Sequence, residues 1–143
     1  MLVMERQGAV TFLISEDGRQ VTSFTHFAQT PCDIDGVAYR LTREGRERFW
    51  LEGPTGTVGV AHRAGRGELL VSSDPHELYL RRASRFSRSW ELHDGGQVVG
   101  SCRSTTFSGQ SDLPAHLPLP VRVFAFYVVI ATQTIEGGFA LWA

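Results

Sequence analysis

The stretch of sequence that decides the fold reads VRVFAFYVVIA and occupies residues 121–131. On an α-helix, with about 100° between successive side chains, its apolar residues cover the whole circumference and Arg122 lies in the single gap. The seven Val, Phe and Ile side chains of this stretch represent roughly 10–20 kcal/mol of transfer free energy from water. Such a helix needs apolar surroundings on every side, from a lipid bilayer, a partner protein or the chain's own β-structure. The location of residues 121–131 therefore largely decides the fold.

The composition is typical of one globular, β-rich domain. Of the 143 residues, 42% are hydrophobic and 20% charged, which excludes wholesale disorder. The 15 glycines and 6 prolines, with β-branched and aromatic residues spread throughout, favour short strands joined by tight turns. We therefore expect a single domain over residues 1–143. The net charge of −1 provides no global field that attracts nucleic acid or a membrane, and no nucleic-acid partner is expected.

One hairpin pattern occurs three times upstream of this stretch. Each copy has an aromatic residue and an aliphatic residue two positions apart, then a turn signal, then a valine seven residues after the aliphatic one. The side chains at the first two positions point to the same face of a strand, so one face of the predicted sheet is apolar. The three copies are Phe12, Ile14 and Val21; Phe49, Leu51 and Val58; and Trp90, Leu92 and Val99.

The spacing of the copies predicts a longer meander. Their starts are 37 and 41 residues apart, which leaves room for another strand pair in each unit, and residues 67–72 and 76–81 form such a pair. Three units are too few to close a β-propeller. We expect a mostly β fold: a closed or nearly closed antiparallel barrel of about 10–12 strands, built from repeated hairpins and wrapped around the hydrophobic C-terminal helix.

The segment around the apolar stretch defines the ends of the helix. Three prolines make residues 112–120 an extended crossing segment, and Pro120 suits the first helical position. Gly137 and Gly138 end the helix, and residues 139–142 form a possible last strand. Over residues 121–135 the helix would be about 22 Å long, against about 30 Å for the hydrocarbon core of a bilayer. The barrel interior is therefore favoured over a membrane span or a partner surface, and the many β-branched residues leave a strand as the alternative conformation.

A resemblance to a known group rests on the third hairpin, RSWELHDGGQVVG at residues 88–100, together with the apolar segment after Pro120. Over residues 9–143 this arrangement resembles the tubby C-terminal-like superfamily, which includes LURP-one-related proteins and phospholipid scramblases. The resemblance implies a barrel of about twelve strands around a central helix, without enzymatic activity, and lipid contact in some members. The chain departs from tubby in lacking lysine and a lipid-headgroup signature. It departs from scramblases in lacking a cysteine-rich segment and a calcium-ligand run.

The best local candidate for a binding site is a run of arginines without an acidic residue. Arginine forks bind phosphate or carboxylate oxygens bidentately, which points to anionic lipid headgroups or a membrane surface. The alternative is a solvated strand pair whose arginines are paired to Glu77 and Glu91. Strand alternation predicts that Arg81 and Arg85 face solvent while Phe86 points inward. The candidate site consists of Arg81, Arg82, Arg85 and Arg88.

No motif indicates catalysis, a metal or a cofactor. Ser73, Asp74 and His76 could be assembled into a triad, but no nucleophile elbow accompanies them. Residues 33–36 read as a hairpin turn rather than a calcium loop. The five histidines are scattered and favour surface or turn positions: His26, His62, His76, His93 and His116.

The two cysteines, Cys32 and Cys102, lack metal-ligand spacing. Two buried, inert thiols are favoured, and a single long-range disulfide is the alternative. The N-terminal residues show no pattern of a signal peptide, so we expect a cytoplasmic protein with peripheral membrane contact if it binds lipid.

The favoured function is a non-enzymatic barrel that binds a lipid, a membrane surface or a protein partner. One alternative is a small-molecule enzyme with a site at a barrel mouth, which requires converging polar groups there. The other is a structural subunit whose interface is marked by Tyr79, Trp50 or Trp142.

Overall fold

The computed structural model describes residues 1–25 and 28–136, which form twelve strands and one helix. The last strand expected over residues 139–142 lies outside the described residues. The strands are β1 (Leu2–Gln7), β2 (Thr11–Glu16), β3 (Arg19–Thr25), β4 (Gln29–Ile34), β5 (Val37–Glu44), β6 (Arg48–Gly53), β7 (Gly56–Gly65), β8 (Glu68–Ser73), β9 (His76–Arg82), β10 (Ser89–Asp94), β11 (Gln97–Ser104) and β12 (Ser108–Asp112), followed by the helix α1 (Leu119–Glu136).

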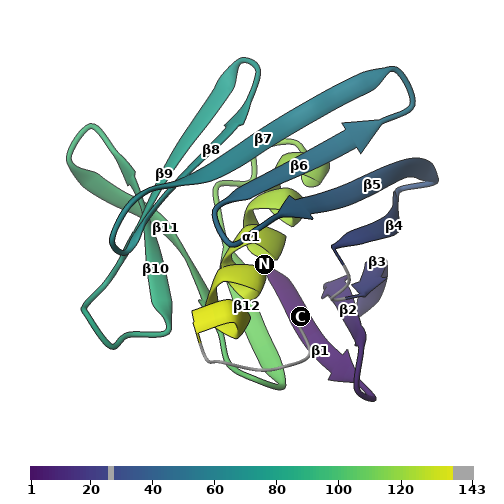
Figure 1. Cartoon of the computed structure of the whole chain (residues 1–143), viewed down its shortest axis with the longest axis horizontal. Helices are drawn as coiled ribbons and strands as arrows, with labels where there is room; N and C mark the ends of the chain where they lie inside the picture. The colour runs from purple at the N-terminus through teal and green to yellow at the C-terminus, as the bar shows by residue number, and fades with distance from the viewer. Residues whose placement is uncertain (26–27, 137–143) are drawn as a thin grey trace.

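The twelve strands form one antiparallel sheet that is rolled into a nearly closed barrel (Figure 1). Neighbours in sequence pair with each other, and β1 also pairs with β12, so the two sheet edges are β3 and β4. These edges pack side by side, and two hydrogen bonds cross the seam between them. One joins Thr25 N to Thr30 Oγ1 at 3.0 Å, and the other joins Thr22 Oγ1 and Cys32 Sγ at 3.0 Å. The predicted barrel is therefore confirmed, with side-chain bonds across its seam.

The three repeated hairpins are confirmed as the pairs β2–β3, β6–β7 and β10–β11. Each pair carries a β-bulge at the same place, because the register leaves the valine of the pattern as an extra residue of the second strand: Val21, Val58 or Val99. A bulge bends its strand and increases the local twist. The repeat thus contains both the apolar face and the kink that lets a sheet roll into a barrel.

Helix α1 runs through the middle of the barrel (Figure 1). Every side chain from Val123 to Ala131 is at most 1% exposed, so strands surround the helix on all sides. The ring of Tyr127 packs edge-on against Phe24 and Phe49, with centroids 5.3 and 6.0 Å away. The predicted plug of the barrel is confirmed, and Pro120 is its second residue instead of its first. In the part of the chain that the structure describes, no helix combines the length and apolarity needed to cross a bilayer.

Two glycines let the helix approach the barrel wall closely. A Cβ atom at Gly59 would lie 3.0 Å from the ring of Phe124. At Gly109 it would lie 3.2 Å from the ring of Phe126 and 2.7 Å from the backbone oxygen of Arg103. Contacts below about 3.4 Å between carbon atoms are repulsive. The wall therefore has no side chain at the points where the rings of Phe124 and Phe126 touch it.

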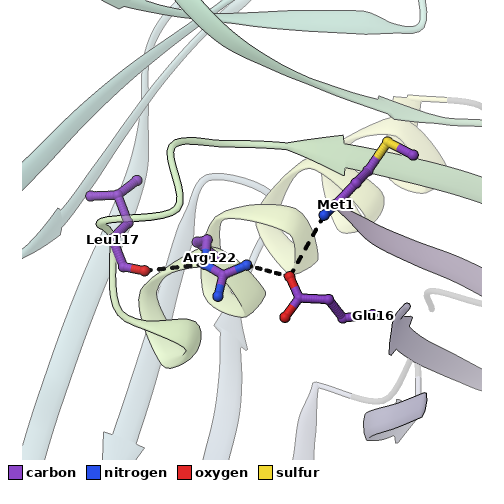
Figure 2. A network of polar contacts seen from close by, with 4 residues as sticks. All are labelled: Met1, Glu16, Leu117 and Arg122. Carbon is purple, nitrogen blue, oxygen red and sulfur yellow. Dashed lines mark hydrogen bonds and ion pairs between the residues drawn. The ribbon is translucent and has the colours of Figure 1, made fainter. Parts of the chain in front are cut away.

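The N-terminal end of α1 is held by a polar network (Figure 2). Arg122, which lies in the gap of the apolar helix surface, donates from Nη1 to Glu16 Oε2 at 2.7 Å and from Nε to the Leu117 oxygen at 3.1 Å. The amino group of Met1 lies 3.7 Å from the same carboxylate oxygen. The hydrogen bond from Arg122 is the main reason that the pKa of Glu16 lies below its ordinary value. The one charged residue of the apolar stretch thus ties α1 to β2.

The alternative of a disulfide is wrong, because both cysteines are free and buried. Cys32 Sγ forms a hydrogen bond with Thr22 Oγ1, and Cys102 Sγ forms one with Ser111 Oγ at 3.2 Å. Burial raises the pKa of Cys32 to about 11 and that of Cys102 to about 12. Both thiols are therefore inert at neutral pH.

Candidate anion-binding site

The predicted arginine run lies beside an open hollow on the outside of the barrel. The hollow has a volume of about 780 Å³ and lies between the β7–β8 turn and the β9–β10 loop. Strand β9 ends with Arg81 and Arg82, and residues 83–88 form the loop that leads into β10. The backbone N–H of Arg82 donates to the Gly67 oxygen at 2.9 Å, which holds the loop against the neighbouring turn. Two short connections of adjacent hairpins therefore form the walls of the hollow.

The structure brings together three of the four predicted arginines and adds two others. Arg81, Arg82 and Arg85 line the hollow, whereas Arg88 is exposed in the same loop but does not line it. Arg63 of β7 and Arg66 of the β7–β8 turn line it as well. Sequence reasoning missed these two because they come from another hairpin. Pairing β8 with both β7 and β9 was the only signal that could have joined them to the run.

The prediction that Phe86 points inward is wrong, because its side chain is 88% exposed. Strand alternation ends at Arg82, where β9 ends, so the period of two does not extend to residue 86. Instead, Ser87 N donates to the Ser84 oxygen at 3.0 Å, and Ala83 N donates to the Ser89 oxygen at 2.9 Å. These bonds form a turn that directs Phe86 into solvent at the rim of the hollow.

The arginines of the hollow differ in their roles. The guanidinium of Arg82 stacks over the ring of Trp90 at 4.7 Å and donates from Nη2 to Gln133 Oε1 at 3.2 Å. Arg82 therefore connects the loop to the core and to the C-terminal part of α1. In contrast, Arg66, Arg81 and Arg85 are exposed. Within residues 1–25 and 28–136, no carboxylate forms an ion pair with any of these three guanidinium groups.

The alternative in which Glu77 and Glu91 neutralise the run is not supported. Glu77 is paired in register with Ser72, at the opposite end of β9 from the hollow. Glu91 lies opposite Arg81 and lines the hollow, but its Oε1 atom lies 3.8 Å from His93 Nε2. The hollow is thus lined by five arginines and by one carboxylate, that of Glu91.

The other candidate residues lie apart from this hollow, except for His93. His62 and His76 lie on β7 and β9, and His116 lies in the segment before α1; His26 is outside the described residues. The hydroxyl of Ser73 is buried and donates to the Val58 oxygen at 2.8 Å, so it is not a free nucleophile. Asp35 and Gly36 form the predicted turn between β4 and β5, and residues 33–34 are the end of β4. Among the described residues, no three His, Cys, Asp or Glu side chains are grouped to hold a metal.

Fold and site together define a class of protein: an antiparallel barrel closed around an internal helix, with an arginine-lined hollow on its outside. No family model matches the chain, and neither a curated protein nor a solved structure matches it. The resemblance to the tubby C-terminal-like superfamily therefore stays a prediction, based on the hairpin pattern and the apolar helix.

Proposed function

We propose that this chain is a non-enzymatic barrel domain that binds the phosphate of an anionic lipid headgroup in the arginine-lined hollow. The observation that supports this most directly is the convergence of Arg66, Arg81 and Arg85. These exposed guanidinium groups come from two different connections and line one concave surface. Arginine is suited to this role because its planar fork donates two parallel hydrogen bonds to phosphate oxygens.

Further features of the hollow fit a phosphate ligand. Ser84 lines it and can add a hydroxyl donor. The guanidinium of Arg85 lies 5.3 Å from the centre of the exposed Phe86 ring, so an apolar group stands next to the cationic one. A headgroup attached to acyl chains offers both a phosphate and an apolar surface, which a free anion does not.

The other functions considered from the sequence have less support. An enzyme site inside the barrel would need space that the buried side chains of α1 occupy. A hollow of about 480 Å³ does lie at the mouth beside the start of α1, but Glu16 and Arg122 in its lining are paired with each other. A protein interface through Tyr79 or Trp50 would need these rings to be exposed, and both are half-buried. Trp142 lies outside the described residues. The lipid-binding function is therefore the one that the geometry supports best.

Sedimentation with vesicles of phosphatidylcholine, with and without phosphatidic acid, tests this proposal. The double variant Arg81→Gln/Arg85→Gln removes two charges from the hollow, and we expect it to lose most of the vesicle binding. The matched control Arg19→Gln/Arg40→Gln removes two exposed arginines elsewhere, and it should bind nearly as well as the native chain. Equal sedimentation of the native chain and the hollow variant would refute the proposal, as would no sedimentation of either.

A further inference from the structure

The two ends of the barrel carry opposite charge. Because the strands are antiparallel, their connections alternate between the ends. We name the end with the β1–β2, β5–β6, β7–β8, β9–β10 and β11–β12 connections the basic end. The acidic end has the connections β2–β3, β4–β5, β6–β7, β8–β9, β10–β11 and the segment between β12 and α1.

Basic and acidic residues are separated between the two ends. This is seen from the charged residues in each connection and in the three strand residues on either side of it. In the connections and strands, the basic end holds eleven of the fourteen arginines and five acidic residues, whereas the acidic end holds one arginine and nine acidic residues. Helix α1 adds Arg122 to the acidic end, and its last residue, Glu136, lies at the basic end. A net charge of −1 for the whole chain conceals this difference. The arginines of the basic end are Arg6, Arg43, Arg46, Arg48, Arg63, Arg66, Arg81, Arg82, Arg85, Arg88 and Arg103.

Among the residues that the structure describes, the two most exposed aromatic side chains also lie at the basic end. Phe86 in the β9–β10 loop is 88% exposed, and Phe107 in the β11–β12 turn is 72% exposed. Backbone hydrogen bonds join the connections that carry these two rings to neighbouring strands. Ser104 N donates to the Arg88 oxygen at 3.3 Å, and Arg6 N donates to the Phe107 oxygen at 2.9 Å. The two rings are thus presented by connections that are tied into the barrel.

We propose that the whole basic end is a docking surface for an anionic lipid bilayer, with Phe86 and Phe107 entering the interface and the acidic end facing away. This inference rests on the proposed function and extends it from one hollow to the orientation of the barrel. An anionic leaflet attracts each arginine within a Debye length, by roughly fivefold in affinity per residue. It repels the acidic end, so the charge segregation favours one orientation. Apolar side chains that enter the interface add to this attraction.

Site-specific labelling tests the orientation. Cys32 and Cys102 are buried, so an environment-sensitive fluorophore reacts selectively with a new exposed thiol. The variants Phe86→Cys and Phe107→Cys place the label at the basic end, and Val98→Cys is the matched control at the acidic end, where Val98 is 52% exposed. With vesicles that contain phosphatidic acid, we expect the emission maximum of the fluorophore to shift to shorter wavelength at positions 86 and 107, where the label enters apolar surroundings. We expect no shift at position 98.

Three results would overturn the inference. These are a shift at position 98 equal to that at the basic end, no shift at any position while the protein sediments with vesicles, and a concentration-dependent shift without vesicles. The last result would indicate that the acidic end of a second copy occupies the basic end.

A second variant separates this inference from the proposed function. The variant Phe107→Ala should lower vesicle affinity roughly tenfold, because its exposed ring no longer leaves water. It should leave the binding of soluble glycerol phosphate, followed by nuclear magnetic resonance titration, unchanged, because Phe107 does not line the hollow. Arg81→Gln/Arg85→Gln should abolish both. If glycerol phosphate binds the native chain but the phenylalanine variant keeps its vesicle affinity, the hollow alone acts and the docking surface is wrong. If the labels report the expected orientation while glycerol phosphate binds neither protein, the headgroup site is wrong.

Discussion

The interior of the barrel and the hollow on its outside are built from opposite chemistry. Inside, α1 presents rings and branched aliphatic side chains that are almost completely buried. The Tyr127 hydroxyl is buried there with no hydrogen-bond partner among the described residues, and burial raises its pKa. Outside, exposed arginines and an exposed phenylalanine surround an open hollow. The comparison indicates that stability resides in the interior, whereas the proposed ligand recognition depends on turns that contribute little to stability.

The largest effect should come from emptying the interior. Phe126→Ala removes a ring that is fully buried against the wall at Gly109, and it should lower the free energy of unfolding by about 3–5 kcal/mol. Phe86→Ala removes the same atoms from an exposed loop, and it should change the free energy of unfolding by less than about 0.5 kcal/mol. Urea unfolding followed by circular dichroism measures both. Similar losses for the two variants would show that the interior and the outer loop do not differ in this way.

A smaller loss is expected where the wall meets the helix. Gly109→Ala places a methyl group 2.7 Å from a backbone oxygen and 3.2 Å from the Phe126 ring, and should cost about 1–3 kcal/mol. Gly65→Ala is the matched control, because the nearest atom, 2.7 Å away, belongs to the flexible end of the Glu68 side chain, which can move. Thermal unfolding of the two variants compares them. A Gly65→Ala variant as unstable as Gly109→Ala would argue against close contact with the helix as the cause.

The polar network at the start of α1 should contribute less, and in a pH-dependent way. Because Arg122 lowers the pKa of Glu16 in the folded chain, its carboxylate stabilises the fold above the ordinary value of 4.5. This stabilisation is lost as the pH falls through the lowered pKa. Both partners keep some exposure, so Glu16→Gln should cost only about 0.5–1 kcal/mol at neutral pH. Denaturant unfolding over a pH series should show the difference from the native chain shrinking in acid; a constant difference would contradict this origin.

The smallest effect on stability is expected in the hollow. Arg81→Gln/Arg85→Gln changes two exposed side chains without ion pairs to described residues, so the free energy of unfolding should change by at most about 0.5 kcal/mol. Arg82→Gln should cost more, because it loses the stacking on Trp90 and the bond to Gln133. Calorimetry of the two variants checks this order. A destabilised Arg81→Gln/Arg85→Gln protein would assign these residues a structural role.

Local patterns in the sequence predicted most of the fold. The apolar circumference of residues 121–131, with prolines before it and glycines after it, predicted the internal helix. The aromatic-x-aliphatic repeat predicted the hairpins, because helix and strand periods depend on near neighbours. The same reasoning was wrong for Phe86, since a strand period was extended past the end of β9. It also did not reveal the shared bulges, which depend on the register between two strands.

The sequence by itself determined the hairpins, the internal helix and the presence of an arginine run, because each is specified within about twenty residues. Only the tertiary structure decided that Arg63 and Arg66 join Arg81 and Arg85 at one hollow, and that basic and acidic connections lie at opposite ends. The physical reason is that both depend on strand order and on closure around α1. These are set by the burial of apolar side chains from the whole chain.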